Sequence, residues 1–293
     1  MEVSMQSKKS DESIAERIGI STNLFLEEEN TLSLIRELAN QFNYVEVELE
    51  GKLREQADEA RNMEMADEIR KIGEETGSTL NLHAPYIRVD FLLGDRREEA
   101  CETILRSAEF AIRAGSRSMT FHPGFRFPKN ASLEQRQEAV ALTQELAMDL
   151  FHVNKHRGSD MVYCLENMGN ERPFLTFDFD EHEEIFATSP VSLTLDMAHV
   201  ASYCETQEEA RKAMQQYARF AGNVHLADVN FPKHLHLPLG AGDFDYHGMV
   251  MALEDCGYQG PYIVEEIAGG YPGEQYLKAA KKYQEELRNR AAA

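Results

Sequence analysis

The residues of this chain best suited to chemistry are carboxylates and imidazoles placed where short apolar runs end. Residues 194–196 end in Asp196, with His199 three positions further on, and residues 223–226 carry His225 in a similar place. Other runs of the same kind end in His83, His122, Glu166 and Glu265. Imidazole nitrogens and carboxylate oxygens are ligands of divalent metals, so this recurrence predicts a metal site.

One such residue alone carries little weight. A single histidine at a strand end is more often a hydrogen-bonded core or surface residue than a ligand, and a single interior carboxylate is more often paired with arginine. A series of consecutive strand ends is different, because converging carboxylates repel one another unless cations neutralise them. We therefore expect a divalent-metal site, with zinc, manganese, iron or cobalt suiting this mixed ligand set better than calcium.

The elements that must position these side chains alternate regularly along the chain. Short apolar runs predict strands at residues 18–22, 44–49, 79–84, 116–122, 161–166, 191–196, 223–226 and 261–265. Stretches of helical periodicity separate them, among them residues 31–41, 97–114, 132–156 and 273–288. This alternation predicts a single α/β domain, a (β/α)₈ TIM barrel over residues 17–290, after a loose N-terminal tail at residues 1–16. The alternative is a doubly wound open sheet, but no GxGxxG string follows the first run to favour it.

In a barrel of this type the active site lies at the C-terminal ends of the strands, and side chains along a strand alternate between two faces. Thr120 then shares the inner face with His122, and Thr194 shares it with Asp196. These polar inner faces contrast with apolar outer ones. The ligand-type residues are therefore expected to point into the barrel.

Other polar residues have more than one interpretation. Glu46 and Glu48 either line the pocket or are solvated or paired with arginine. His152, His156 and His182 lie on predicted helices or away from the strand ends, and we expect them at the surface. The string LPLGAGD at residues 237–243 predicts a tight turn more than a phosphate-binding loop.

Composition bounds the class of protein. The 293 residues are 42% hydrophobic and 28% charged, which is typical of a globular chain, and the net charge of −21 argues against a broad nucleic-acid-binding face or binding to anionic membranes. Four dispersed cysteines, with no secretory leader and no apolar run that could span a membrane, predict free thiols in a cytoplasmic protein.

The strings around these residues resemble a known family. They are LHAPY at residues 82–86, FHPG at 121–124, CLEN at 164–167, LDMAH at 195–199, VHLAD at 224–228, LPLGAGD at 237–243 and YQGP at 258–261, which leads to Glu265. In this order they resemble the xylose-isomerase-like barrels, the superfamily of sugar isomerases and epimerases that also holds endonuclease IV (AP endonuclease family 2). The resemblance runs from about residue 18 to residue 266.

The resemblance implies a core metal site formed by Glu166, Asp196, His225 and Glu265. In the isomerases and epimerases of this group the metal holds two oxygens of an open-chain ketose and stabilises an enediolate. The two glutamates then move a proton at the carbon beside the carbonyl. His199 is implied to contact a substrate oxygen.

Three further residues are expected to bind substrate: His83, His236 and Asp228. Asp228 follows His225 closely, and we expect it to act by orienting a neighbouring histidine.

The alternative within the same superfamily is a phosphodiesterase that acts on abasic-site DNA with three zinc ions. Its additional ligands map onto His83, His122, His199, His234 and His236. His234 stands where that branch has an aspartate, residues 200–204 lack its Gly-Tyr-Asp continuation, and residues 87–90 lack its asparagine. These departures put DNA cleavage in doubt more than metal binding.

From these arguments we expect a divalent-metal-dependent isomerase or epimerase that acts on a sugar or related polyhydroxylated small molecule. A barrel that binds metal or ligand without catalysis is a third hypothesis, but it would not need both Glu166 and Glu265. The expected partner is a small-molecule substrate. Nucleic acid is disfavoured by the charge but left open, and so is assembly into a homo-oligomer.

Overall fold

A computed structural model describes residues 12–26, 28–51, 53, 62–87, 89–92, 96–123, 131–169, 179–233, 236–265 and 271–292. Eight parallel strands close into a barrel in the order of the chain. They are β1 (Ile18–Ser21), β2 (Tyr44–Glu48), β3 (Thr79–His83), β4 (Ser118–Phe121), β5 (Val162–Glu166), β6 (Ser192–Asp196), β7 (Ala221–Leu226) and β8 (Tyr262–Val264). Each predicted strand is present within a few residues of its expected bounds, and the predicted (β/α)₈ barrel is confirmed.

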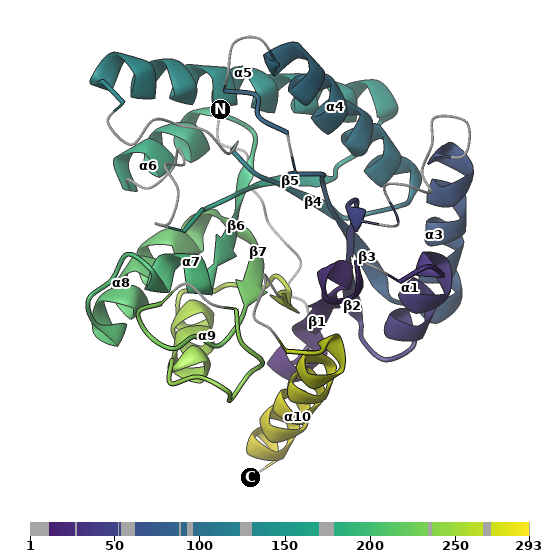
Figure 1. Cartoon of the computed structure of the whole chain (residues 1–293), viewed down its shortest axis with the longest axis vertical. Helices are drawn as coiled ribbons and strands as arrows, with labels where there is room; N and C mark the ends of the chain where they lie inside the picture. Colours follow the sequence, from purple (N-terminus) through teal and green to yellow (C-terminus); the bar gives the residue numbers. More distant parts are fainter. Residues whose placement is uncertain are drawn as a thin grey trace.

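The helices surround this barrel, as Figure 1 shows. They are α1 (Thr31–Ala39), α3 (Asn62–Thr76), α4 (Arg97–Arg113), α5 (Leu133–Arg157), α6 (Phe179–Thr188), α7 (Met197–Ala201), α8 (Gln207–Tyr217), α9 (Tyr246–Asp255) and α10 (Gly273–Ala291), with 3-10 turns η1 (Ile14–Arg17), η2 (Thr22–Phe25) and η3 (Ala218–Phe220). Among the described helices, none is long and apolar enough to cross a membrane.

The alternation of side chains along the strands explains how the barrel is both stable and polar inside. On β6, Leu193 and Leu195 belong to the apolar core, whereas Thr194 and Asp196 are buried polar residues. The hydroxyl of Thr194 lies 2.8 Å from the hydroxyl of Thr120 on β4, so the inner faces of these two strands meet across the barrel. This contact agrees with the inward direction expected for the ligand-type side chains two residues further along each strand.

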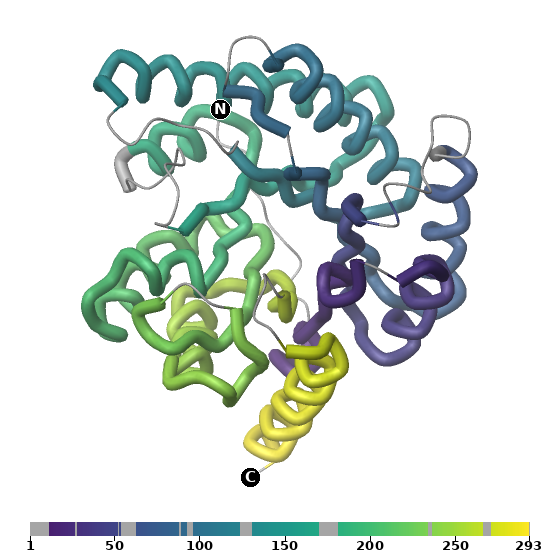
Figure 2. Tube along the Cα trace, viewed as in Figure 1, coloured from purple at the N-terminus to yellow at the C-terminus, as the bar shows by residue number. Residues whose placement is uncertain are grey.

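The two ends of the described chain are held together at the β1–β8 seam. The two strands pair in parallel, and Gln284 of α10 donates to the carbonyl oxygen of Ile18 at 3.0 Å. The guanidinium of Arg17, itself buried, donates to the carbonyl oxygen of Gly260 at 2.9 Å and pairs with Glu254. Figure 2 shows the resulting arrangement, with the yellow α10 beside the purple start of the barrel.

The N-terminal boundary is less simple than a loose tail up to residue 16. Residues 14–16 are part of η1, where Ala15 is buried and Ser13 and Glu16 form a capping box. The expected tail therefore ends in a short helical turn that packs next to the barrel.

Candidate active site

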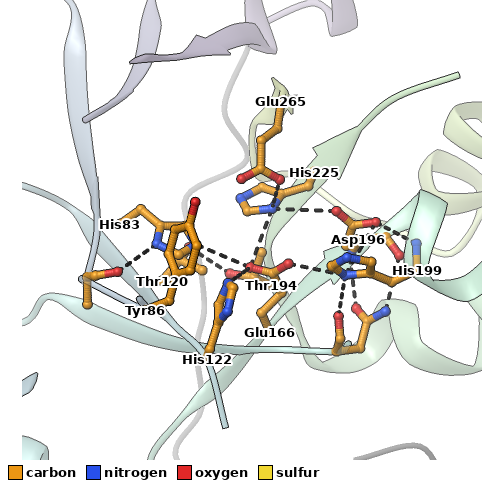
Figure 3. Close-up of polar contacts among 12 residues, drawn as sticks. His83, Tyr86, Thr120, His122, Glu166, Thr194, Asp196, His199, His225 and Glu265 are labelled. Carbon is orange, nitrogen blue, oxygen red and sulfur yellow. Dashed lines mark hydrogen bonds and ion pairs between the residues drawn. The ribbon is translucent and has the colours of Figure 1, made fainter. Parts of the chain in front are cut away.

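Four side chains converge in the barrel mouth: Glu166, Asp196 and His225 at the ends of β5, β6 and β7, and Glu265 just after β8. The Nδ1 atom of His225 lies 2.8 Å from Glu265 Oε2, 3.6 Å from Glu166 Oε2 and 3.8 Å from Asp196 Oδ2. Figure 3 shows His225 at the centre of this group. The residues expected to form the core metal site thus lie together.

Each of these four side chains has one buried polar atom that makes no hydrogen bond of standard geometry, although two of these atoms, His225 Nδ1 and Glu265 Oε2, face each other at 2.8 Å. The atoms are Glu166 Oε1, Asp196 Oδ2, His225 Nδ1 and Glu265 Oε2. Buried polar atoms in proteins nearly always have a hydrogen-bond partner, so four such atoms within one small volume call for a ligand. Carboxylate oxygens and an imidazole nitrogen grouped in this way are suited to binding a divalent metal ion.

Asp196 and His199 are three residues apart because a helix begins between them. One oxygen of Asp196, Oδ1, accepts the backbone N–H of His199 at 2.7 Å and caps the short helix α7. The other oxygen stays available in the barrel mouth. Asn167 braces the same region, since its side chain bonds both the backbone N–H and the carbonyl of Asp196, at 2.8 and 3.1 Å.

The ring of His199 is held by the backbone of Asn167, the residue that directly follows β5. Its Nδ1 lies 2.7 Å from the carbonyl oxygen of Asn167, and because a carbonyl can only accept, Nδ1 carries the hydrogen. The Nε2 atom is therefore the one that can act as an acceptor or ligand. The ring also contacts the ring of His236, with centroids 5.3 Å apart.

His83 and His122 lie on the other side of Glu166. The Nδ1 of His83 donates to the carbonyl oxygen of Ala84 at 2.9 Å, and its Nε2 lies 3.3 Å from Glu166 Oε2. The Nε2 of His122 lies 3.2 Å from the same oxygen. Tyr86 stacks on the ring of His122 with centroids 4.7 Å apart, so both histidines are fixed against one carboxylate (Figure 3).

His236 reaches the site from the loop after β7. Its Nε2 lies 3.6 Å from Asp196 Oδ2, and the hydroxyl of Tyr276 donates to its backbone carbonyl at 2.8 Å. His234, the other histidine expected on this loop, lies outside the described residues.

Three of the buried imidazoles, His83, His199 and His225, have raised pKa values, whereas burial lowers the pKa of His122. Burial by itself disfavours the imidazolium, but Glu48 and Glu166 outweigh it and raise the pKa of His83 to about 10. In the same way Asp196 and Glu166 raise the pKa of His199 to about 9, against burial. In the absence of a metal these rings are therefore cations at neutral pH, and they offset part of the carboxylate charge.

The carboxyl groups diverge in their pKa values. Burial dominates at Asp196 and raises its pKa to about 7. Burial acts the same way on Glu265, but the nearby His225 outweighs it and lowers the pKa to about 2. Environments that push two acids apart in this way are a common feature of sites that transfer protons.

Two glutamates of β2 complete the inner surface, and the sequence left their position open. Glu46 and Glu48 are both buried, and within the described part of the chain neither is paired with arginine. Glu46 Oε1 lies 2.8 Å from His225 Nε2, and Glu48 Oε2 lies 3.6 Å from His83 Nδ1. Both therefore line the site, Glu48 beside His83, its register partner on the neighbouring β3, and Glu46 beside His225 on the distant β7. No local sequence signal could reveal the contact between Glu46 and His225.

We expected Asp228 to bind substrate and to orient a neighbouring histidine. In the structure its carboxylate instead binds backbone N–H groups of the chain. Its two oxygens accept the backbone N–H groups of Val229, Gly240, Gly242 and Phe244 at 2.8 to 3.2 Å. A methyl group at Gly242 would meet Asp228 Oδ1 at 2.5 Å, so a glycine is needed for this approach. Asp228 holds the 238–244 loop, whose glycine N–H groups bind a carboxylate of the chain itself.

His182 was expected at the surface, and this was wrong. It is buried on α6, where its ring stacks on Phe186 at 5.7 Å and meets Tyr217 edge-on at 5.0 Å. The signal was available, because Phe186 lies four residues further along and so shares a helix face with His182. His152 and His156 are exposed, as expected.

Residues 34–289 match the family described as the xylose isomerase-like TIM barrel. The chain belongs to this family. Among curated proteins of known sequence, the uncharacterized protein MJ1188 of Methanocaldococcus jannaschii is 26% identical over 188 residues, which span 63% of this chain and 65% of that protein.

Several solved structures share the fold of this family. A D-tagatose 3-epimerase-like protein has a TM-score of 0.74 at 20% identity, over 94% of this chain and 100% of that one. The 3-keto-D-glucoside 4-epimerase YcjR from E. coli has a TM-score of 0.70 at 20% identity, over 93% and 99%. The IOLI protein with a bound zinc atom has a TM-score of 0.71 at 19% identity, over 92% and 97%.

Proposed function

We propose that this protein is a divalent-metal-dependent isomerase or epimerase that acts on a sugar or a related polyhydroxylated small molecule. One observation carries the proposal. Four buried ligand-type atoms from Glu166, Asp196, His225 and Glu265 lie within 4.8 Å of one another, and one atom of each side chain makes no hydrogen bond of standard geometry.

The donor set fits a divalent ion. Ligands placed about 2.1 Å from a metal in tetrahedral geometry are about 3.4 Å apart. The distances from His225 Nδ1 to the three carboxylates, 2.8 to 3.8 Å, bracket this separation. Three carboxylates and one imidazole suit zinc, manganese or cobalt.

The two glutamates of the set are suited to transferring a proton. When bound, a divalent ion would polarise a carbonyl group of the substrate. Glu265 is a carboxylate at the end of this site and can accept a proton from the carbon beside that carbonyl. Glu166 lies on a different strand and can return a proton, and His199 offers its Nε2 to a substrate oxygen.

The similar structures support this proposal, because two of them are described as an epimerase or epimerase-like protein of sugars and one holds zinc. We also infer a single barrel domain over residues 17–290 and a cytoplasmic location, the latter because all four cysteines are free.

The test is proton exchange at carbon. Metal-loaded protein would be incubated with a panel of ketoses and keto-sugars in D₂O, and deuterium beside the carbonyl would be measured by NMR. We expect incorporation with at least one substrate, and a rate of incorporation about 10²- to 10⁴-fold lower in Glu265→Gln. The exposed Glu208→Gln is the matched control. Equal exchange in wild type and Glu265→Gln would overturn the assignment of Glu265.

A second candidate is the trinuclear phosphodiesterase, and a specific observation favours it. Three further groups place their ligand atoms within 4.8 Å, and two of them, His83 with His122 and Glu166, and Asp196 with His199 and His236, consist of ligands expected for this candidate; the third is Glu46 with Glu48 and His83. We favour the isomerase because the net charge of −21 disfavours a DNA-binding face and because two of the similar structures are described as an epimerase or epimerase-like protein. Cleavage of abasic-site DNA by zinc-loaded protein would establish the second candidate instead.

A further inference from the structure

Glu46 is a buried carboxylate whose two oxygens are held by side chains from other strands. Oε1 accepts from His225 Nε2 at 2.8 Å, and Oε2 accepts from Asn223 Nδ2 at 2.8 Å. The hydroxyl of Thr120 donates to Oε2 at 3.4 Å and joins Glu46 to the Thr194 hydroxyl across the barrel. Side chains of β4 and β7 therefore fix the position of this carboxylate inside the barrel, next to His225.

The contact with Glu46 determines which nitrogen of His225 carries a hydrogen. A carboxylate facing Nε2 accepts a hydrogen from it, so the ring keeps its Nε2–H. The lone pair of the neutral imidazole is then on Nδ1. That atom is the one that lies nearest to Glu265, Glu166 and Asp196.

We propose that Glu46 is a positioning residue that fixes His225 as an Nδ1 ligand of the divalent ion. This inference rests on the metal site of the proposed function. Hydrogen bonds from a carboxylate to the far nitrogen of a ligand histidine fix the ring orientation and its tautomer, and their loss weakens metal binding by about 10- to 100-fold. Glu46 supplies this bond from β2, a strand that contributes no ligand to the four-residue core site.

The isosteric Glu46→Gln separates the hydrogen bond from the charge. Its amide oxygen can still accept from His225 Nε2, while its amide nitrogen would face Asn223. The oxygen Oδ1 of Asn223 has no hydrogen-bond partner, so a flip of the Asn223 amide would satisfy the new donor. Glu46→Leu removes the acceptor altogether. The matched control is Glu48→Gln. Glu48 is a buried glutamate two residues further along the same face of β2, and it makes no hydrogen bond to His225.

The first measurement is the dissociation constant of zinc and of manganese, each by chelator competition, on protein whose folding is verified by circular dichroism. We expect Glu46→Leu to weaken binding by about 10- to 100-fold, and Glu46→Gln and Glu48→Gln to weaken it less. Equal affinities in wild type and Glu46→Leu would overturn the proposal. So would equal losses in Glu46→Leu and Glu46→Gln, since the charge and not the hydrogen bond would then be responsible.

The second measurement needs no variant. Long-range ¹H–¹⁵N spectra of zinc-loaded wild type should show His225 with a protonated Nε2 and a metal-bound Nδ1. The opposite pattern, or a wild-type protein that binds no divalent ion at this site, would overturn the inference. Because neither readout uses turnover, metal binding that depends on Glu46 in a protein without isomerase activity would refute only the proposed function.

Discussion

At the scale of single residues, Asp196 shows how one side chain serves both structure and chemistry. Its Oδ1 caps α7 and its Oδ2 lies in the barrel mouth without a hydrogen-bond partner. The spacing between Asp196 and His199 is therefore the spacing of a helix cap, in which the N-cap side chain accepts from the third helical residue. The spacing of the two residues predicted a pair of ligands, whereas the capping bond that places them is seen only in the structure.

Substitutions at Asp196 should separate these two roles. Asp196→Asn keeps an oxygen for the cap but lacks the anionic ligand, so we expect near wild-type stability and a strongly reduced metal content. Asp196→Ala loses both and should unfold about 1 kcal/mol more easily as well. Urea unfolding of metal-free protein and elemental analysis measure the two effects. Full metal content in Asp196→Asn would show that the core site is misplaced.

At the scale of elements, the strand pattern was enough to predict the barrel and much of its site. The strand ends that carry His83, His122, Glu166, Asp196 and His225 are where the sequence placed them. Contacts between distant strands could not be predicted from the sequence. One example is the contact of Glu46 with His225, which lies 179 residues further along the chain. A buried glutamate is unfavourable in isolation, so sequence alone left Glu46 open between pocket and solvent.

The 238–244 loop depends on one carboxylate, and its stability can be tested. Asp228→Ala would leave four backbone N–H groups without their acceptor, and we expect a loss of about 2–4 kcal/mol in the free energy of unfolding. Asp243→Ala on the same loop removes an exposed acceptor of one N–H group, that of Phe231, and should cost about 1 kcal/mol or less. Equal effects of the two substitutions, measured by urea unfolding, would contradict the role given to Asp228.

At the scale of the whole molecule, the barrel concentrates ionisable groups in its interior, and its stability should depend on pH accordingly. The folded-state pKa values of His83 and His199, about 10 and about 9, lie above the ordinary value of 6.5. Their contribution to stability is complete below pH 6.5 and is lost as pH rises through these values. The lowered pKa of Glu265, about 2 against 4.5, contributes above pH 4.5 and is lost as pH falls toward 2.

Metal-free protein should therefore be more stable at about pH 6 than at about pH 9.5, and Asp196, with its raised pKa, acts in the same direction. Zinc should reverse this trend, because a metal replaces protons on its ligands and binds more tightly as pH rises. Urea unfolding at both pH values, with chelator and with zinc, tests the pair of statements. A metal-free protein that gains stability between the two pH values would contradict the charge assignments.

The central claim is a single divalent ion held by Glu166, Asp196, His225 and Glu265, and metal stoichiometry tests it most directly. Elemental analysis of protein purified without a histidine tag should find about one zinc, manganese or cobalt ion per chain. About three zinc ions per chain would contradict the claim and favour the phosphodiesterase. No metal, even after reconstitution, would contradict both functions.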